Sequence, residues 1–233
     1  MSARNVVVRT VDRATSATID SLAMIGTATV HEAMGRIGFA GPHLRPIQQG
    51  TSIAGSAVTV SCHPGDNLMI HAAVEVCQAG DILVVTNTAP STHGMFGDLL
   101  AGSLMARGVR GLVIDAGVRD TADLRAIGFP VWSQHVSCQG TVKATPGSVN
   151  VPVVLGGQIV RGGDVVCADD DGVVIVAMAA ADEALALSQA RIQKEAATRL
   201  RLNAGELGID IYGLRATLEA LGVEYVNRLD DAS

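Results

Sequence analysis

Aromatic residues are scarce in this chain of 233 residues, which contains three Phe, two Tyr and one Trp. Proteins that bind single-stranded nucleic acid stack successive bases on aromatic side chains, so the composition argues against such a platform. Hydrophobic residues make up 48% of the chain, and most of them are Val, Ala, Leu and Ile. We therefore expect a soluble globular protein with a closely packed aliphatic core.

Positive charge is also limited. The formal net charge is −6, and the seventeen Lys and Arg residues are scattered along the chain. No basic field is therefore expected that could neutralise a phosphate backbone, and we expect no nucleic-acid partner. Only two of the cations are lysines, Lys143 and Lys194, so few residues could form a Schiff base with a carbonyl substrate.

The sequence also lacks closely spaced cysteine pairs and long apolar runs. The four cysteines form no C-x-x-C pair, so the sequence predicts neither a structural zinc site nor a redox motif. Residues 1–13 lack the apolar segment of a signal peptide, and no apolar run is long enough to span a bilayer. We expect a cytoplasmic protein with reduced, buried thiols and no membrane partner.

Apolar runs and helix-compatible segments alternate along the first part of the chain. Helical spacing covers 18–35, and a loop rich in proline and glycine follows at 38–50. The expected strands after this loop are 53–62, 82–86, 111–114 and 130–136, and the expected helices between them are 64–77, 97–107 and 121–127. This alternation predicts a parallel or mixed α/β sheet.

The composition of the sequence changes after residue 140. Glycine, valine and turn signals over 140–176 predict short antiparallel strands, the last of them at 173–176. Two helices are expected at 181–203 and 212–221. Because no flexible linker is visible, we predict an α/β fold in a single domain, 1–233, with mixed sheet layers flanked by helices and a helical C-terminal extension.

A cation and a carboxylate, Arg119 and Asp120, stand side by side beyond the expected strand 111–114. Ligands of α/β sheets bind beyond the carboxyl ends of strands, so this pair is a candidate for ligand binding. A structural alternative stays open. Asp120 could cap the helix that begins at Thr121, with Asp123 completing a capping-box-like pair, while Arg119 makes a surface ion pair.

Asp98 follows Gly97 at the start of an expected helix. It could simply complement the helix dipole. Alternatively, the free N–H groups of Leu99 and Leu100 could bind a substrate carboxylate, with Asp98 holding a water of a metal ion.

Asn67 and His71 are four residues apart and would share one face of a helix. A lone histidine on a helix is more often a hydrogen-bonded structural residue than a catalytic one. Both residues are nevertheless candidates for the lining of a site.

Twenty residues separate Asp98 from the Arg119-Asp120 pair, and this spacing resembles that of the pyruvate aldolases which cleave 4-hydroxy-4-methyl-2-oxoglutarate and 4-carboxy-4-hydroxy-2-oxoadipate. The similarity extends from about residue 27 to residue 195. It includes the segments TATVHEAMGR, GDNLMIHAA, GDLLAGSLMARGVRGLVIDAGVRD, QGTVKATPGSVNVPV and GDVVCADDDGVVIV. The resemblance implies the fold of the RNase E inhibitor proteins, and assembly into homotrimers or pairs of trimers.

The resemblance also implies the roles of individual residues. Asp120 would be the direct protein ligand of a divalent cation, Mg²⁺ or Mn²⁺, and Asp98 would hold water in its coordination shell. Glu195, from the C-terminal extension 181–233 of a neighbouring subunit, would complete the site through water. The expected catalytic residues are therefore Arg119, Asp98 and Glu195. The expected substrate-binding residues are Gly97, Asp98, Leu99, Leu100, Arg119, Asn67 and His71.

The implied reaction is metal-dependent retro-aldol cleavage of a 4-hydroxy-2-oxo acid to pyruvate plus oxaloacetate or pyruvate, in protocatechuate and gallate breakdown. Cleavage of the C3–C4 bond leaves an enolate, which a Lewis acid and Arg119 would stabilise. A water polarised by Asp98 is the expected base for the C4 hydroxyl. Oxaloacetate decarboxylation is an expected side activity, because loss of CO2 leaves the same enolate.

Two alternatives belong to other classes. Proteins of this fold include RNase E inhibitors that bind without catalysis, and fold does not fix function. Those inhibitors lack the aspartate of the pair, which this chain keeps as Asp120. A Schiff-base aldolase that uses Lys143 or Lys194 would stabilise the same carbanion without a metal.

Overall fold

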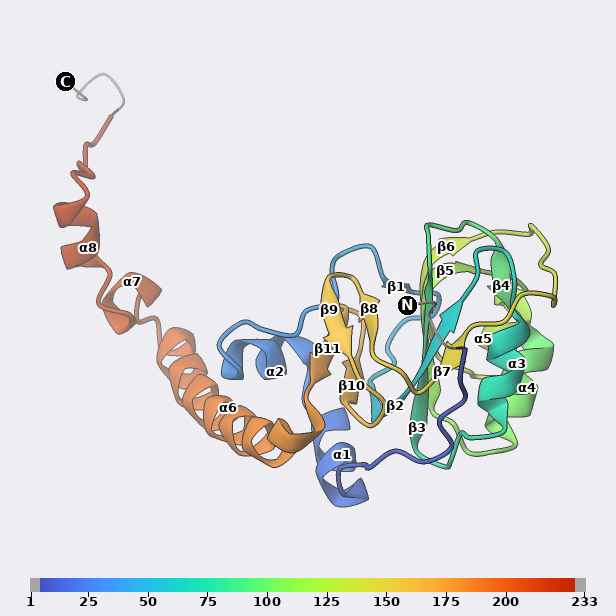
Figure 1. The fold of residues 1–233 in the computed structure, drawn as a ribbon. Helices are drawn as coiled ribbons and strands as arrows, with labels where there is room; N and C mark the ends of the chain where they lie inside the picture. Colours follow the sequence, from blue (N-terminus) through green and yellow to red (C-terminus); the bar gives the residue numbers. More distant parts are fainter. Residues whose placement is uncertain (1–4, 229–233) are drawn as a thin grey trace. The chain divides into compact units, whose positions relative to one another are not determined.

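The computed structural model describes residues 5–228, and the chain divides into two compact units, Met1–Ser188 and Gln189–Ser233. The first unit contains both sheets and the α/β alternation (Figure 1). Residues 1–4 and 229–233, which include the ends of the expected signal-free N-terminus and of the C-terminal extension, lie outside the described residues.

The first unit is built on a nine-stranded mixed sheet with the strand order β1-β6-β5-β3-β2-β10-β11, in which β4 pairs with β5 and β7 pairs with β2. Its strands are β1 (Arg45–Pro46), β2 (Ile53–Cys62), β3 (Asp81–Asn87), β4 (Gly94–Phe96), β5 (Gly111–Val118), β6 (Val131–Val136), β7 (Ser148–Val149), β10 (Val165–Ala168) and β11 (Val173–Val176). A separate hairpin pairs β8 (Val153–Leu155) with β9 (Gln158–Val160).

The central strands β2, β3, β5 and β6 run parallel to one another. Helices connect them on one face: α3 (Leu68–Val74), α4 (Asp98–Met105) and α5 (Thr121–Ala126) (Figure 1). These strands are nearly continuous runs of aliphatic residues because both faces of the sheet are covered. Side chains of the three helices form one core cluster with β2, β3 and β5, while the opposite face packs on the β8–β9 hairpin.

Two further helices, α1 (Ser16–Ala23) and α2 (Thr27–Ala33), pack with β10 and β11 in a third cluster. The expectation of one helix over 18–35 is wrong, because the chain breaks between the two at residues 24–26. The carboxylate of Asp169 accepts hydrogen bonds from the amide and the hydroxyl of Thr27, at 2.7 Å and 2.6 Å. This distant side chain caps α2 and fixes a helix start that the apolar spacing did not indicate.

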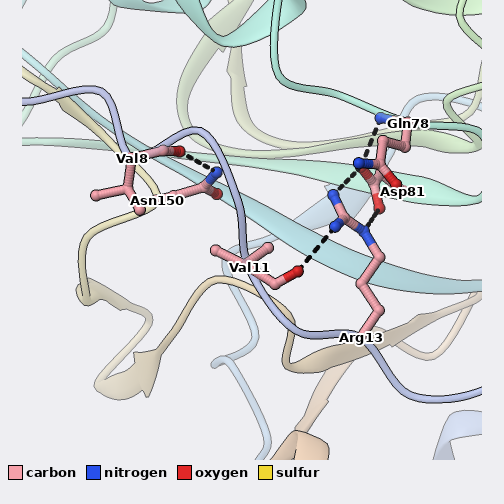
Figure 2. Close-up of polar contacts among 6 residues, drawn as sticks. All are labelled: Val8, Val11, Arg13, Gln78, Asp81 and Asn150. Atoms are coloured by element: carbon pink, nitrogen blue, oxygen red, sulfur yellow. Dashed lines mark hydrogen bonds and ion pairs between the residues drawn. The ribbon is translucent and has the colours of Figure 1, made fainter.

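A strap of N-terminal residues crosses the first unit (Figure 2). Val7 forms a parallel bridge with Val149, and the Asn150 side-chain amide donates to the carbonyl of Val8 at 2.9 Å. Further along, the Arg13 guanidinium donates to both oxygens of buried Asp81, at 2.8 Å and 2.9 Å. The strap therefore ties residues 7–13 to β7 and to the start of β3.

The second unit is helical. It holds the larger part of α6 (Ala181–Asn203), followed by α7 (Gly208–Ile211) and α8 (Arg215–Ala220). The expected helix 181–203 is confirmed, whereas the expected helix 212–221 begins three residues late, and α7 was not expected. The compact units divide after Ser188, inside α6. The single domain with an interface-forming extension stays a prediction.

The expected α/β fold with a mixed sheet flanked by helices is confirmed. The strand expected at 53–62 coincides with β2, and the one at 173–176 with β11. Three thiols, Cys62, Cys77 and Cys167, are free and buried as expected, and burial raises the pKa of each to about 12. Cys138 is exposed, which the expectation of buried thiols missed. Within residues 5–228, no helix combines the length and apolar character needed to cross a membrane.

Candidate active site

Arg119 and Asp120 follow β5 directly. The strand continues to Val118, four residues beyond the expected end, and the Arg119 amide then donates to the carbonyl of Phe96 at 2.9 Å. Asp120 adopts a left-handed backbone conformation, with φ 55° and ψ 36°. Aspartate tolerates this region better than most residues, and such outliers gather at functional sites.

Asp120 occupies the N-cap position of α5, but its side chain makes no capping hydrogen bond. Its carbonyl oxygen alone starts the helix, by accepting from the Leu124 amide at 2.9 Å. The interpretation of Asp120 as a side-chain cap is therefore wrong. The carboxylate instead lies 3.4 Å from the Nε atom of Arg119.

β4 brings two glycines against this pair, and it was not expected from the sequence. A Cβ at Gly97 would overlap the Asp120 Oδ2 atom, and a Cβ at Gly94 would overlap the Ser137 carbonyl oxygen. Gly97 has an extended backbone, with φ −154° and ψ −170°, so glycine is required here for space and not for a positive φ. The close approach places the start of α4 beside Asp120.

A cavity of about 190 Å³ opens at this place. All the candidate residues that belong to the first unit line it. They are Asn67, His71, Gly97, Asp98, Leu99, Leu100, Arg119 and Asp120. The structure therefore brings together residues from β4, α3, α4 and the β5–α5 loop that are up to 53 positions apart in sequence.

The first turn of α4 forms one side of the cavity. Asp98 is the acidic residue of that turn, and Gly97 at the N-cap has no side chain with which to cap the helix. Leu100 is buried, whereas the side chain of Leu99 is 82% exposed. Because the first amides of a helix lack intrahelical partners, this open end is suited to an anionic ligand group.

Asn67 and His71 also line the cavity. Asn67 is only 7% exposed, and its side-chain amide donates to the Met95 carbonyl at 3.0 Å. Its Oδ1 atom is buried and accepts no hydrogen bond within the described chain. Buried acceptors are normally hydrogen-bonded, so this atom is suited to accept from a ligand or a water. Desolvation, together with the positive charge of Lys143, lowers the pKa of His71 below 6.5, so His71 is neutral at neutral pH.

Lys143 also lines the cavity. From the sequence, this residue was a candidate only as a Schiff-base nucleophile. The one sequence signal for its position is the resemblance segment QGTVKATPGSVNVPV, which contains it. With Arg119, it gives the cavity two cations, opposed by the carboxylates of Asp98 and Asp120.

Oxygen ligands suit a hard divalent cation, and two carboxylates in one cavity leave room for several waters on an ion such as Mg²⁺. Among residues 5–228, no cluster of three or more His, Cys, Asp or Glu side chains could hold a metal with protein ligands alone. The residues present therefore fit a cation held by one or two carboxylates and water, and not a closed zinc-type centre.

Glu195 lies on α6 in the second unit. Its Oε1 atom is 2.7 Å from the Nε atom of Arg191, one helical turn earlier. This helical ion pair is the structural alternative for Glu195, and it is present in the chain. A role for Glu195 in the active site of a neighbouring subunit stays a prediction.

Comparisons with known proteins identify the family and the fold. A family model described as RraA-like, Aldolase/RraA, matches residues 27–175. A protein of Halalkalibacterium halodurans, provisionally named a 4-hydroxy-4-methyl-2-oxoglutarate aldolase, is 28% identical over 178 residues, covering 76% of this chain and 82% of its own length. One of Shewanella oneidensis with the same provisional name is 33% identical over 121 residues, covering 52% and 73%.

Among solved structures, Streptomyces coelicolor RraAS2, an unusual member of the RNase ES inhibitor RraA family, superposes with a TM-score of 0.75. It is 28% identical, and the match covers 82% of this chain and all of that one. This similarity confirms the expected RNase E inhibitor-like fold.

Proposed function

This chain belongs to the RraA-like family, and on that premise we propose that it is a divalent-metal-dependent lyase which releases pyruvate from a 4-hydroxy-2-oxo acid. The proposed substrates are 4-hydroxy-4-methyl-2-oxoglutarate and 4-carboxy-4-hydroxy-2-oxoadipate. Relatives with a provisional aldolase name support the reaction class. The family also contains inhibitor proteins, so the proposal depends on the site and not on the fold.

One observation carries the proposal. A single cavity is lined by a cation, two carboxylates and the open start of a helix: Arg119, Asp98, Asp120 and the first turn of α4. A purely structural role for Asp120 is not supported, because its side chain does not cap α5. These groups match what cleavage of a 2-oxo acid requires, namely an anion site, a Lewis acid and a donor to the enolate oxygen.

Each residue of the cavity would have a separate role in the proposed cleavage. The first amides of α4 would bind the C1 carboxylate. As the C3–C4 bond breaks, its electron pair forms the C2=C3 double bond and the carbonyl π pair moves onto the C2 oxygen, to which Arg119 would donate. Asp98, through a water, would take the proton of the C4 hydroxyl, which becomes a carbonyl. The same water would then return this proton to C3 of the enolate, which gives pyruvate. A cation held by Asp120 would supply Lewis-acid stabilisation of the enolate when bound.

Lys143 gives the cavity a second cation besides Arg119. A substrate with more than one carboxylate can place one of them at the start of α4 and another beside this ammonium. Neutral His71 can either donate or accept a hydrogen bond. The cavity is therefore better suited to a dicarboxylic or tricarboxylic substrate than to a neutral aldol.

A coupled assay for pyruvate tests the proposal. Release of pyruvate from the two aldol substrates and from oxaloacetate should require Mg²⁺ or Mn²⁺, and should stop after treatment with EDTA. Full turnover after exhaustive chelation would contradict metal dependence. Absence of turnover with every substrate and cation would instead favour a binding protein of the inhibitor type.

The position of Lys143 favours one competing mechanism, a Schiff base with the substrate carbonyl. Lys194 is exposed on α6 and is the weaker candidate. Incubation with pyruvate and borohydride, followed by mass spectrometry, distinguishes the two mechanisms. A trapped adduct on Lys143 would replace the metal mechanism, whereas unmodified lysines in an active preparation support it.

A further inference from the structure

Asp66 is a buried carboxylate that directly precedes Asn67, a residue of the cavity lining. It is only 1% exposed. Its Oδ1 atom accepts a hydrogen bond from the Leu68 amide at 2.9 Å. Its Oδ2 atom accepts from the amides of Ala144 and Thr145, at 2.8 Å and 2.6 Å. One side chain therefore binds two segments that are almost eighty residues apart in sequence.

Both segments carry residues of the cavity. Leu68 is the first residue of α3, so this hydrogen bond fixes the helix start that lies between Asn67 and His71. The other two hydrogen bonds come from Ala144 and Thr145. These residues directly follow Lys143, which lines the cavity.

Backbone pairing supports the same junction. The Val142 amide donates to the Gly65 carbonyl at 3.0 Å, and the Asn67 amide donates to the Val142 carbonyl at 3.1 Å. Asp66 and Val142 thus form a short parallel bridge. Lys143 follows this bridge and precedes the two amides bound to Asp66, so its backbone is held on both sides.

The charge of Asp66 matters for this arrangement. Burial alone would raise the pKa of its carboxyl group, but hydrogen bonds from Leu68, Ala144 and Thr145 outweigh burial and lower the pKa below its ordinary value. The group is therefore ionised at neutral pH. In Asp66→Asn, one of the two acceptor oxygens is replaced by an NH2 group. That group would face at least one backbone N–H, which would lose its hydrogen-bond acceptor.

We propose that Asp66 is a positioning residue whose carboxylate holds segment 142–145 so that the Lys143 ammonium stays in the cavity wall beside His71. The consequence for substrate binding rests on the proposed function, since Lys143 then meets the carboxylate of the substrate that is farther from the start of α4. The positioning itself does not depend on any reaction.

The resonance of His71 provides a readout that is independent of turnover. We expect Asp66→Asn and Lys143→Met each to raise the pKa of His71 toward 6.5, because the charge of Lys143 helps to lower it. Combining the two substitutions should add nothing further. The titration is followed by ¹³C-histidine NMR in the absence of metal and substrate, with His71 assigned from the spectrum of His71→Gln.

Asp81→Asn is the matched control. Asp81 is also a buried carboxylate, bound by Arg13 and by the Gln78 amide at 2.7 Å (Figure 2), but it does not line the cavity. This substitution should reduce stability and leave the pKa of His71 unchanged. If Asp66→Asn does the same, Asp66 is merely structural and the proposal is overturned.

A second variant keeps the test decisive if Asp66→Asn fails to fold. Ala144 is exposed, and Ala144→Pro removes one of the donors to Asp66 while the carboxylate stays in place. It should raise the pKa of His71 as Lys143→Met does. A folded Ala144→Pro protein with the wild-type titration of His71 would contradict the proposal. The titration of His71 tests the positioning role even if the wild-type protein shows no aldolase activity.

Discussion

The Nε atom of Arg119 lies 3.4 Å from the Oδ2 atom of Asp120, although the two residues are consecutive in the chain. Both side chains are partly exposed to solvent, and exposed pairs of this kind contribute about 1 kcal/mol or less to stability. The left-handed conformation of Asp120 lets both neighbours line one cavity. The pair is therefore better explained by binding than by folding.

Asp120→Asn should abolish turnover and weaken the binding of Mg²⁺ or Mn²⁺, because the amide removes the negative charge that would hold the ion. Asparagine also tolerates left-handed conformations, and no capping bond is lost, so stability should change by less than about 1 kcal/mol. Isothermal titration calorimetry and the pyruvate assay measure both effects. Asp123→Asn, in the first turn of α5, is the control, and wild-type activity of Asp120→Asn would contradict the assigned role.

Arg119→Lys should lower kcat much more than it weakens substrate binding. Lysine keeps the charge but loses the planar fork of donors, and removal of one preorganised donor to a developing oxyanion costs about 10² to 10³ in kcat. Steady-state kinetics on both aldol substrates give kcat and KM separately. Arg107→Lys, at an exposed position after α4, should behave like the wild type. A rise in KM alone would reduce Arg119 to an anchor for the substrate.

Gly97→Ala should displace the Asp120 carboxylate, since the new methyl group would overlap its Oδ2 atom. Misplacement of a catalytic group by about 1 Å can cost about 100-fold in rate. Gly102→Ala is a sharp control, because Gly102 lies in α4 with nothing within 4 Å of its Cβ position. That change should stabilise the helix by up to about 1 kcal/mol. Equal activities of the two variants would show that the contact does not matter.

How far the sequence predicts this structure depends on the range of the interactions involved. Strand 53–62 and helix 181–203 were predicted with their correct bounds, because local apolar patterns specify them. The break at residues 24–26 was missed, since the carboxylate that caps α2 comes from Asp169, 142 positions away from Thr27. The three-residue strand β4 was missed because it depends on pairing with β5.

The candidate site shows the same limit. Eight lining residues were predicted through the family resemblance and lie in one cavity. Lys143 was not placed, because its position depends on hydrogen bonds from the next two residues to Asp66, 78 and 79 positions earlier. The capping interpretation of Asp120 failed for another reason. A local motif predicts a cap, whereas the side chain makes no capping hydrogen bond in the structure.

The two-subunit site can be tested by complementation. We expect Asp120→Ala and Glu195→Ala proteins, each inactive alone, to recover activity after they are dissociated, mixed and reassembled. Some sites would then combine an intact Asp120 with an intact Glu195 from another chain. Native mass spectrometry verifies the mixed oligomers. Verified mixtures that stay inactive would leave Glu195 as the helical partner of Arg191.

Acid stability offers a test of the charge on Asp66. Its pKa in the folded protein lies below the ordinary value, so its ionisation stabilises the fold above the unfolded-state pKa of about 3.9. This contribution should be lost progressively as the pH falls below that value. Urea unfolding at several pH values should therefore show that the stability gap between wild type and Asp66→Asn narrows under acid. A gap that is constant with pH would indicate a defect in packing instead.

The N-terminal strap imposes an order on the assembly of the cavity. The Val8 amide donates to the carbonyl of Val149 at 3.1 Å, and the Val149 amide donates to the carbonyl of Val6 at 2.8 Å. Val6 and Val8 can therefore pair with Val149 only after some 140 further residues have been synthesised. Contacts of such long separation carry a loop-closure cost that local helices do not. We expect the segment between Lys143 and Asn150 to dock late in folding, so that a nascent chain lacks one wall of the cavity until most of the sheet has formed.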